Sequence, residues 1–333
     1  MVVAEATADG HTGLGYSYAS AASARLISEM LADLVVGHDA LSPPAAWERM
    51  RHQVRNIGYA GVASSAISAV DIALWDLKAR LLGVDLSSLL GRVRDRVPIY
   101  GSGGFTTYTP EQMRTQLNGW VSDGIQAFKI KVGAEPERDL ARALHARDVI
   151  GPDRALFVDA NGAYSRKQAL EFAELFSEQA YVTWFEEPVP SDDLEGLRLL
   201  RDRAPSGMEI AAGEYGYDLF YFRRMLEAGA VDVLQADVTR CGGITQMLQV
   251  SALCAARGMQ LSAHTSPAIH AYVGAALQPL VHVEYFHDHT RIERQLFTGA
   301  ELLQDGMLVP ARAALGMGLA LREEVAEHHE IGA

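Results

Sequence analysis

The pattern of apolar and polar positions changes character near residue 97. Before it, a short strand-like segment over residues 2–7 runs into Asp9-Gly10, a dipeptide typical of hairpin turns, and predicts a small antiparallel sheet. Amphipathic segments then predict three helices, over residues 20–36, 44–57 and 62–82. The third is the clearest, because apolar residues recur at i, i+3 and i+4 and Gly83 stands where helices commonly end. This first part of the chain is expected to be an α+β unit.

From residue 97 onward, short apolar segments alternate with longer amphipathic ones. The segments predict eight strands, at 97–101, 126–131, 155–159, 181–186, 209–214, 231–237, 259–264 and 280–284. From the second strand onward, consecutive strand ends lie at most 28 residues apart (Lys131 to Asp159) and at least 20 (His264 to Glu284), enough for a helix, a strand and two short loops. Parallel strands buried on both faces read as apolar runs, so the pattern predicts a (β/α)8 barrel.

Every predicted strand from the second to the eighth ends in a charged or titratable residue. These residues are Lys131, Asp159, Glu186, Glu214, Asp237, His264 and Glu284. A single polar strand end is commonly a helix cap or part of a salt bridge. Seven in succession are hard to explain in that way. Because the strand ends of a barrel meet on one rim, the rim is the predicted active site.

Three carboxylates, Asp159, Glu186 and Glu214, close consecutive strands. Neighbouring strands lie about 4.8 Å apart, so these groups can approach a common point. Each like-charge pair would cost about 4 kcal/mol at ~4 Å and an effective dielectric constant of about 20, a repulsion that a divalent cation would turn into coordination. Oxygen ligands favour Mg²⁺, with Mn²⁺ as a substitute, over zinc.

Lys129 and Lys131 stand two residues apart on one strand, so their side chains point the same way. We expect their mutual repulsion to lower the pKa of at least one, which could then act as a base near neutral pH. The other would hold a substrate anion. In the alternative interpretation, both lysines and Arg240 merely neutralise the carboxylates in a network of salt bridges.

His264 and Asp237 end neighbouring strands and predict a second acid/base, in which the carboxylate fixes the imidazole tautomer. Glu284 lies on the next strand, where burial would raise its pKa and let it donate a proton to a substrate oxygen.

Two weaker patterns give further expectations. Alternation along a strand places Glu186 and Glu187 on opposite faces, which disfavours a glycosidase-type carboxylate pair. His287-Asp288-His289 is expected to be a polar loop rather than a metal site.

Composition narrows the class of protein. The chain has 333 residues, 49% hydrophobic and 21% charged, the balance of a globular protein. Acidic residues outnumber basic ones by 42 to 29, a net charge of −13, so we expect no nucleic-acid partner and no binding to anionic membranes. Cys241 and Cys254 are too few for a disulfide framework and the sequence predicts no secretory signal, so we expect a cytoplasmic protein.

Taken together, these residues resemble the enolase superfamily, and within it the mandelate racemase-like subgroup of the mandelate racemase/muconate lactonizing enzyme family, of the acid-sugar dehydratase type. The motifs that carry the resemblance, in family order, are AISAVDIALWDLKARLLGVDLSSLLG at 66–91, KIK at 129–131, DANG at 159–162, EEP at 186–188, GE at 213–214, D-x-x-R-x-G-G at 237–243, and the His264 and Glu284 positions. The first motif departs from the family at Asp85, where a small residue or proline is usual.

The resemblance implies a (β/α)8 TIM-type barrel with an α+β capping domain. The expected divisions are a capping domain at 1–93, the barrel at 94–299, and a C-terminal segment at 300–333 that returns to the capping domain. The family's capping domain normally begins with further strands and a mobile loop, so this one is expected to be shortened at its N-terminus. The Tyr16-Ser17-Tyr18 segment is then a candidate for contacts that cover the site.

By position, the resemblance makes Asp159, Glu186 and Glu214 the Mg²⁺ ligands. It makes Lys131 one acid/base, and His264 with Asp237 the opposing one. The candidate substrate contacts are Lys129, Asn161, Arg240 and Glu284.

The implied chemistry is removal of the proton α to the carboxylate of a small-molecule substrate, through an enolate that Mg²⁺ stabilises. We favour dehydration of an acid sugar to a 2-keto-3-deoxy acid. The alternatives are racemisation or epimerisation of a 2-hydroxy acid by the same two bases, and a non-catalytic anion-binding barrel. The resemblance also implies a homo-oligomer.

Overall fold

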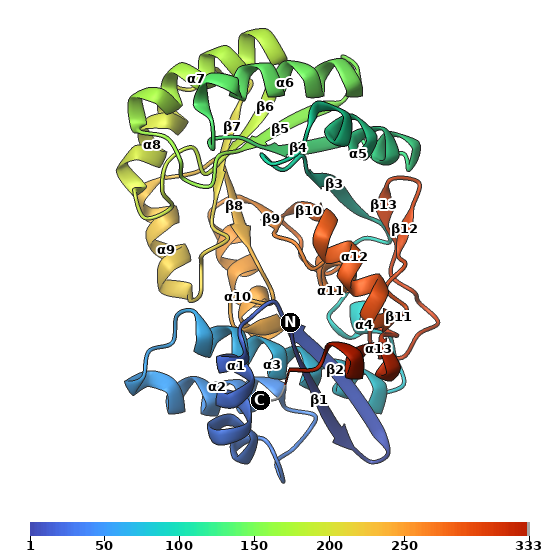
Figure 1. Cartoon of the computed structure of the whole chain (residues 1–333). Coiled ribbons are helices and arrows are strands. Elements are labelled where there is room, and N and C mark those ends of the chain that lie inside the picture. The colour runs from blue at the N-terminus through green and yellow to red at the C-terminus, as the bar shows by residue number, and fades with distance from the viewer. Residues whose placement is uncertain (332–333) are drawn as a thin grey trace.

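The computed structural model describes residues 1–331, and its centre is a closed barrel of eight parallel strands (Figure 1). The strands are β3 (Val97–Gly103), β4 (Ala127–Lys131), β5 (Ala155–Asp159), β6 (Val182–Glu186), β7 (Glu209–Ala212), β8 (Val233–Ala236), β9 (Gln260–Ala263) and β10 (Leu280–Phe286). Pairing of β10 with β3, in the register Val283 to Ile99, closes the barrel. The predicted fold and its eight strands are therefore confirmed, although β7, β8 and β9 end one or two residues earlier than expected.

Helices alternate with the strands and cover the outside of the barrel (Figure 1). They are α5 (Pro110–Ser122), α6 (Pro136–Ile150), α7 (Arg166–Ala180), α8 (Leu194–Arg203), α9 (Leu219–Ala228), α10 (Gly243–Ala256), α11 (Pro267–Gly274) and α12 (His287–Leu296). Thr109 and Ser165 begin α5 and α7 with capping boxes, which satisfy backbone N–H groups of the first turn. Inside the barrel, Tyr100, Phe157 and Trp184 form a separate apolar cluster, so the interior is packed rather than open.

The N-terminal domain is a hairpin packed on one long helix. Strands β1 (Val2–Ala8) and β2 (His11–Ser17) pair around the predicted Asp9-Gly10 turn. Helices α2 (Pro43–Gln53) and α3 (Val62–Leu81) agree closely with prediction, whereas the expected first helix is divided into α1 (Ala21–Leu26), a π-helical turn η1 (Ile27–Leu31) and a 3-10 turn η2 (Ala32–Leu34). The short elements η3 (Val54–Asn56) and α4 (Leu86–Leu89) complete the domain. The hairpin lies so close to α3 that a Cβ at Gly15 would come within 2.2 Å of the Ala69 carbonyl oxygen.

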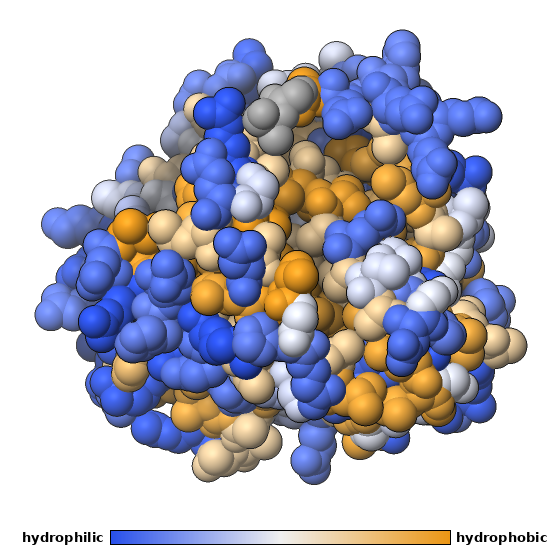
Figure 2. All heavy atoms as spheres, turned by 90° about the horizontal axis from the view of Figure 1, so that it is seen from below, coloured by the Kyte–Doolittle hydropathy of each residue, from blue (hydrophilic) through white to orange (hydrophobic). Residues whose placement is uncertain are grey.

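Figure 2 shows the capping domain from below, with apolar side chains gathered inside a border of hydrophilic ones. A groove on this domain is lined by apolar residues of β1, η1 and α3, among them Val3, Ile27 and Leu74. Among the described residues, no helix combines the length and apolar character needed to cross a lipid bilayer.

The capping domain is attached to the barrel by polar side chains that meet the loop after β8. The Asp71 carboxylate accepts from the Thr245 backbone N–H at 2.9 Å, and Ser68 Oγ accepts from Gly242 N–H at 2.8 Å. Trp47 Nε1 donates to the Gly242 carbonyl oxygen at 2.8 Å. These contacts place the domain over the rim that carries the predicted site.

The C-terminal segment runs back along both domains. Its elements are β11 (Phe297–Thr298), β12 (Leu303–Gln304), β13 (Met307–Leu308), β14 (Ala320–Leu321) and α13 (Glu323–His329). Strand β13 pairs antiparallel with the barrel strand β3. Farther along, the Met317 N–H donates to the buried Asp76 of α3 at 2.6 Å, and the same carboxylate accepts from Leu14 N–H and Arg80 Nε. Asp76 therefore ties the hairpin, α3 and the C-terminal segment together.

We predict that Asp76→Ala lowers the free energy of unfolding by about 3 kcal/mol, because it leaves buried donors without a partner. Denaturant unfolding followed by circular dichroism measures the loss. Glu48→Ala is the matched control, since Glu48 forms an exposed helical ion pair with Arg51 and should cost less than about 1 kcal/mol. Equal losses in the two variants would contradict the role given to Asp76.

Candidate active site

The rim that faces the capping domain brings together all seven titratable residues predicted at the strand ends. Lys131, Asp159 and Glu186 are the last residues of β4, β5 and β6, and Glu284 lies within β10. Glu214, Asp237 and His264 follow β7, β8 and β9 by one or two residues. The carboxylates among them are all at most 4% exposed. The barrel therefore concentrates ionisable groups where little water reaches them.

The three predicted metal ligands lie close together. Asp159 and Glu186 are paired in register on neighbouring strands, and each of Asp159, Glu186 and Glu214 offers an oxygen within 4.8 Å of the others. Burial, together with the charge of Asp159, raises the pKa of Glu186 to about 8. Three carboxylates held this close, with oxygen donors only, suit a hard divalent cation.

Lys129 and Lys131 point into the same group of carboxylates, as their spacing predicted. Lys129 Nζ lies 2.5 Å from Glu186 Oε1, 2.7 Å from Glu284 Oε1 and 3.3 Å from Asp159 Oδ2, and Lys131 is paired with Asp159. The expected lowering of a lysine pKa is wrong. Burial lowers the pKa of both, but the surrounding carboxylates outweigh burial and mutual repulsion, so both pKa values are raised.

The salt bridges that the sequence allowed as an alternative are thus present, but the buried carboxylates outnumber the fixed cations that pair with them. The buried carboxylates at the rim are Asp159, Glu186, Glu187, Glu214, Asp237 and Glu284. Within residues 1–331, three permanent cations are paired with this group, namely Lys129, Lys131 and Arg240. Protons on Glu186, Glu187 and His264, whose pKa values are raised, take up the remaining charge. A bound divalent cation would take the place of protons among the carboxylates, so the donor set fits Mg²⁺ as well as the ion pairs.

The predicted pair of Asp237 and His264 is formed. His264 Nδ1 lies 2.8 Å from Asp237 Oδ2, and the N–H and Oγ1 of Thr239 both donate to Asp237 Oδ1 at 2.7 Å. With Nδ1–H donating to Asp237, Nε2 is left on the side of Glu214 and Glu284, at 3.2 and 3.4 Å. Burial lowers the pKa of His264, but these two carboxylates outweigh it and raise the pKa to about 10. His264 is thus an oriented imidazole whose proton is held by the site's anions.

Glu284 is also placed as predicted, but its expected protonation is wrong. Its carboxylate accepts from Ser102 Oγ at 2.6 Å and from Thr265 N–H at 3.2 Å, besides its contact with Lys129. Burial raises the pKa of Glu284, yet the charges of Lys129 and His264 lower it further, so the net shift is downward. The argument from burial alone overlooked these cations.

Asn161 and Arg240 lie at the edge of the site. The Asn161 N–H donates to Asp159 Oδ1 at 2.9 Å, and the residue lines, with Lys131, a hollow of about 500 Å³. Arg240 Nη1 donates to the Glu214 carbonyl oxygen at 3.2 Å, and its Nε lies 3.5 Å from Asp237 Oδ2. Both residues therefore touch groups with predicted chemical roles, and both reach the mouth of the barrel.

Glu187 is the acidic residue whose position the sequence argument missed. Alternation predicted that it points away from the site, but β6 ends at Glu186 and Glu187 has a left-handed φ of 38°. It is 1% exposed, and burial with the charge of Glu214 raises its pKa to about 9. The following Pro188 was the available signal that strand geometry stops here.

The segment His287-Asp288-His289 is also different from the expected loop, because it forms the first turn of α12. The His289 ring stacks on Tyr18 of the capping domain, and its Nδ1 lies 3.3 Å from Ser266 N, two residues after His264. The Tyr16-Ser17-Tyr18 segment does contact the rim, since Ser17 Oγ donates to the Thr239 carbonyl oxygen at 2.7 Å. Among the described residues, the group able to hold a metal is the Asp159, Glu186 and Glu214 set.

Comparison with known proteins identifies the family. Residues 1–91 match the N-terminal domain of mandelate racemase/muconate lactonizing enzymes, and residues 112–325 match the enolase C-terminal domain-like family. The chain belongs to the mandelate racemase/muconate lactonizing enzyme family. This confirms the family resemblance drawn from the sequence motifs.

Individual relatives align with most of this chain. The chain is 34% identical to 3,6-anhydro-alpha-L-galactonate cycloisomerase of Streptomyces coelicolor, over 84% of this chain and 78% of the relative. It is 32% identical to L-talarate/galactarate dehydratase of Salmonella typhimurium, over 96% of this chain and 80% of the relative. A mandelate racemase/muconate lactonizing enzyme-like protein from Rubrobacter xylanophilus is 50% identical, with a TM-score of 0.96 over 98% of this chain and 90% of that chain.

Magnesium is present in a related structure, a racemase from Streptomyces coelicolor that is 29% identical, with a TM-score of 0.90 over 98% of this chain and 91% of that chain. The same ion fits the carboxylates of this family member, because Asp159, Glu186 and Glu214 supply three converging oxygens in a site where buried carboxylates outnumber fixed cations.

We predict that Mg²⁺ raises the midpoint of thermal unfolding and that Glu214→Gln abolishes this effect. A ligand that binds only the folded state stabilises it by about 2.7 kcal/mol at a concentration of 100 times its Kd. Scanning calorimetry with and without Mg²⁺ measures the shift. Glu209→Gln is the matched control, because Glu209 is an exposed acid at the other end of the same strand β7. A full Mg²⁺ effect in Glu214→Gln would rule out this site.

Proposed function

We propose that this enzyme removes the proton α to the carboxylate of an acid sugar and eliminates the β-hydroxyl, which gives a 2-keto-3-deoxy acid. The observation that carries this proposal is the placement of two proton-transfer groups on different sides of the carboxylate triad. Lys131 ends β4, and His264 follows β9. In one direction around the barrel, the strands that carry the triad lie between Lys131 and His264. In the other direction, β3 and β10 lie between these two residues.

The residues divide the work by position. Lys129 Nζ, which is fully buried, supplies positive charge for the substrate carboxylate and the developing ene-diolate. When bound, Mg²⁺ supplies further charge for the same purpose and cancels part of the carboxylate charge that raises the pKa of Lys131. Lys131 then takes the α-proton, and the electron pair of that C–H bond forms the double bond between the α-carbon and the carboxyl carbon of the ene-diolate.

Departure of the β-hydroxyl needs a proton, because hydroxide is a poor leaving group. His264 is suited to donate it, since Asp237 orients the ring and the neighbouring carboxylates favour the imidazolium form. The electron pair of the ene-diolate forms the double bond between the α- and β-carbons, the pair of the β-carbon–oxygen bond leaves with water, and the resulting enol tautomerises to the 2-keto acid. Protonation at the α-carbon by His264 would instead give the epimer, which is the racemase alternative.

Neutral polar groups at the mouth of the barrel favour a hydroxylated substrate. The hollow beside Lys131 is lined by Thr106, Thr107 and Asn161, whose hydroxyl and amide groups can pair with sugar hydroxyls. Relatives named as an acid-sugar dehydratase and an anhydrosugar-acid cycloisomerase support this substrate class. An ether oxygen on the β-carbon can leave as a hydroxyl does, so both reactions fit one set of residues.

We predict that the wild-type enzyme with Mg²⁺ converts at least one member of a panel of aldonic and aldaric acids to a keto acid in D₂O, as followed by proton NMR. Lys131→Met and His264→Asn should each lower the rate by about 100-fold to 10,000-fold, the usual contribution of a general acid or base. Lys167→Met, at an exposed position in α7, should retain the wild-type rate.

The panel also separates the alternatives. Loss of the α-proton signal without keto acid would replace dehydration by epimerisation. Tight binding in calorimetry with neither exchange nor product would replace both by a non-catalytic anion-binding barrel.

A further inference from the structure

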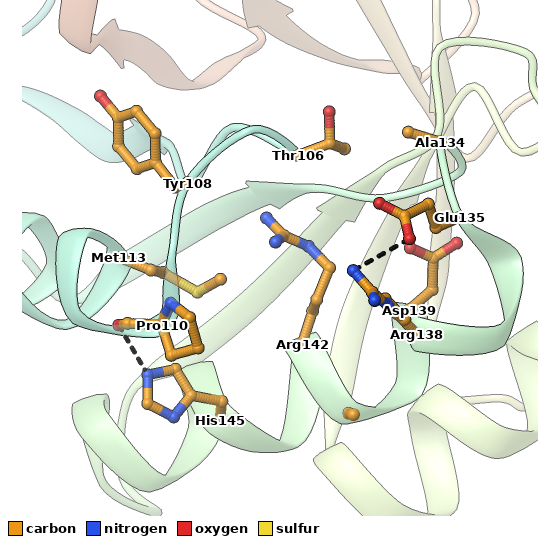
Figure 3. Close-up of a pocket in the computed structure, with 11 residues that line it drawn as sticks. Thr106, Tyr108, Pro110, Met113, Ala134, Glu135, Arg138, Asp139, Arg142 and His145 are labelled. Atoms are coloured by element: carbon orange, nitrogen blue, oxygen red, sulfur yellow. Dashed lines mark hydrogen bonds and ion pairs between the residues drawn. The ribbon is translucent and has the colours of Figure 1, made fainter.

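The loop after β3 stands between two hollows. On the side of the barrel mouth is the hollow of about 500 Å³ that includes Lys131 and Asn161. On the outer side is a second hollow of about 320 Å³, lined by α5, α6 and the same loop (Figure 3). Thr106 lines both. With a hollow on each side, polar contacts rather than close packing must hold much of this loop in place.

Arg142 of α6 supplies those contacts. Figure 3 shows its side chain extending from the helix toward the loop that carries Thr106. Its Nη2 donates to the carbonyl oxygens of Gly104 at 2.7 Å and of Phe105 at 2.9 Å, and its Nε donates to the Lys131 carbonyl oxygen at 3.3 Å. One guanidinium therefore joins the loop after β3 to the end of β4.

The backbone around Lys131 depends on the same helix. The Lys131 N–H donates to the Gly104 carbonyl oxygen at 3.2 Å, the oxygen that Arg142 also contacts. Asp139, three residues before Arg142, accepts from the Gly133 N–H at 2.8 Å. Helix α6 thus holds the main chain at Lys131 and two residues beyond it.

We propose that Arg142 is a positioning residue for proton transfer by Lys131. It acts from the outer side of the barrel, where it fixes the direction of the backbone at Lys131, the last residue of β4. It also fixes the position of Phe105 and Thr106, which line the site beside the substrate. The proposal rests on the proposed function, because it assigns Lys131 a proton-transfer role. A lysine at position 142 cannot replace the guanidinium, since a single ammonium lacks the planar fork that reaches three carbonyl oxygens.

The same helix provides a matched control. Arg147 is also half-buried, and it donates to the carbonyl oxygens of Ala180, Gly151, Arg154 and Tyr181. Arg147 and its contacts lie at the C-terminal end of α6, whereas Lys131 lies just before the N-terminal end of this helix. Arg147→Lys therefore removes a comparable set of hydrogen bonds without touching the rim.

The test uses two acid sugars that differ only in configuration at the α-carbon, with deuterium exchange in D₂O followed by NMR. In one the α-proton faces Lys131, and in the other it faces His264, as the Lys131→Met and His264→Asn variants identify. Arg142→Lys should slow exchange of the first by about 10-fold to 100-fold, the effect expected of a small misplacement of a reacting group. The exchange rate of the second substrate should stay within about twofold of the wild-type rate. A general loss of folding would instead slow exchange of both substrates.

Arg147→Lys should show no such preference between the two substrates. Equal slowing of both substrates in Arg142→Lys, or no slowing, would overturn the positioning role. If the wild-type enzyme exchanges neither substrate, the proposed function fails instead.

A second measurement does not depend on turnover. Amide hydrogen exchange, read by mass spectrometry, should be faster in Arg142→Lys for peptides that cover residues 101–108 and 128–134. The same peptides should be unchanged in Arg147→Lys. Unchanged exchange in Arg142→Lys would show that Arg142 does not hold this backbone, and would overturn the proposal whatever the substrate.

Discussion

The buried negative charge at the rim is the constraint on which the site depends. Six carboxylates lie at most 4% exposed within one end of the barrel, and burial alone disfavours the charge of each. Such a group stays ionised only if cations or hydrogen-bond donors compensate it. The protonation states of Lys129, Lys131 and His264 follow from this requirement, since each is held in its charged form by the carboxylates. A divalent cation belongs to the same balance.

The barrel explains why so much charge can be gathered there. Parallel strands bring their carboxyl ends to one rim. The first residues beyond each strand are held in place by the strand, but their side chains no longer have to alternate between its two faces. The apolar interior at Tyr100, Phe157 and Trp184 makes the scaffold beneath the rim rigid. Stability is therefore supplied below the rim, and the unfavourable charge is confined to the layer where it serves the reaction.

The sequence predicted the fold and the membership of the site well, because both depend on periodicity. A strand ending in a charged residue can be recognised without knowing its neighbours, so Asp159, Glu186, Glu214, Asp237 and Glu284 were all placed correctly. The lowered pKa expected of one of the two lysines and the protonation expected of Glu284 were predicted wrongly, because each shift was argued from one or two causes and the net shift depends on every charge nearby. Glu187 was misplaced for a related reason, since alternation was applied one residue beyond the end of its strand.

The partners in contacts that no periodic pattern encodes were not predicted, although the Tyr16-Ser17-Tyr18 segment was expected to help cover the site. The stacking of Tyr18 on His289 joins residues 271 positions apart, and Arg142 meets carbonyl oxygens, which every residue possesses. These contacts show that the two residues proposed to transfer protons, Lys131 and His264, are supported from different parts of the molecule. The capping domain meets the loops beside Asp237 and His264 through Ser17 and the Tyr18–His289 stack.

The Lys131 side of the rim is supported from α6, on the outside of the barrel. Motion of the capping domain would therefore disturb the His264 side first and leave the backbone at Lys131 in place. With the roles proposed for Lys131 and His264, this arrangement lets the geometry of one base be adapted to a substrate without displacing the other. Divergence of substrate within such a fold is then expected to concentrate where the capping domain meets the barrel, while the contacts of α6 stay constant.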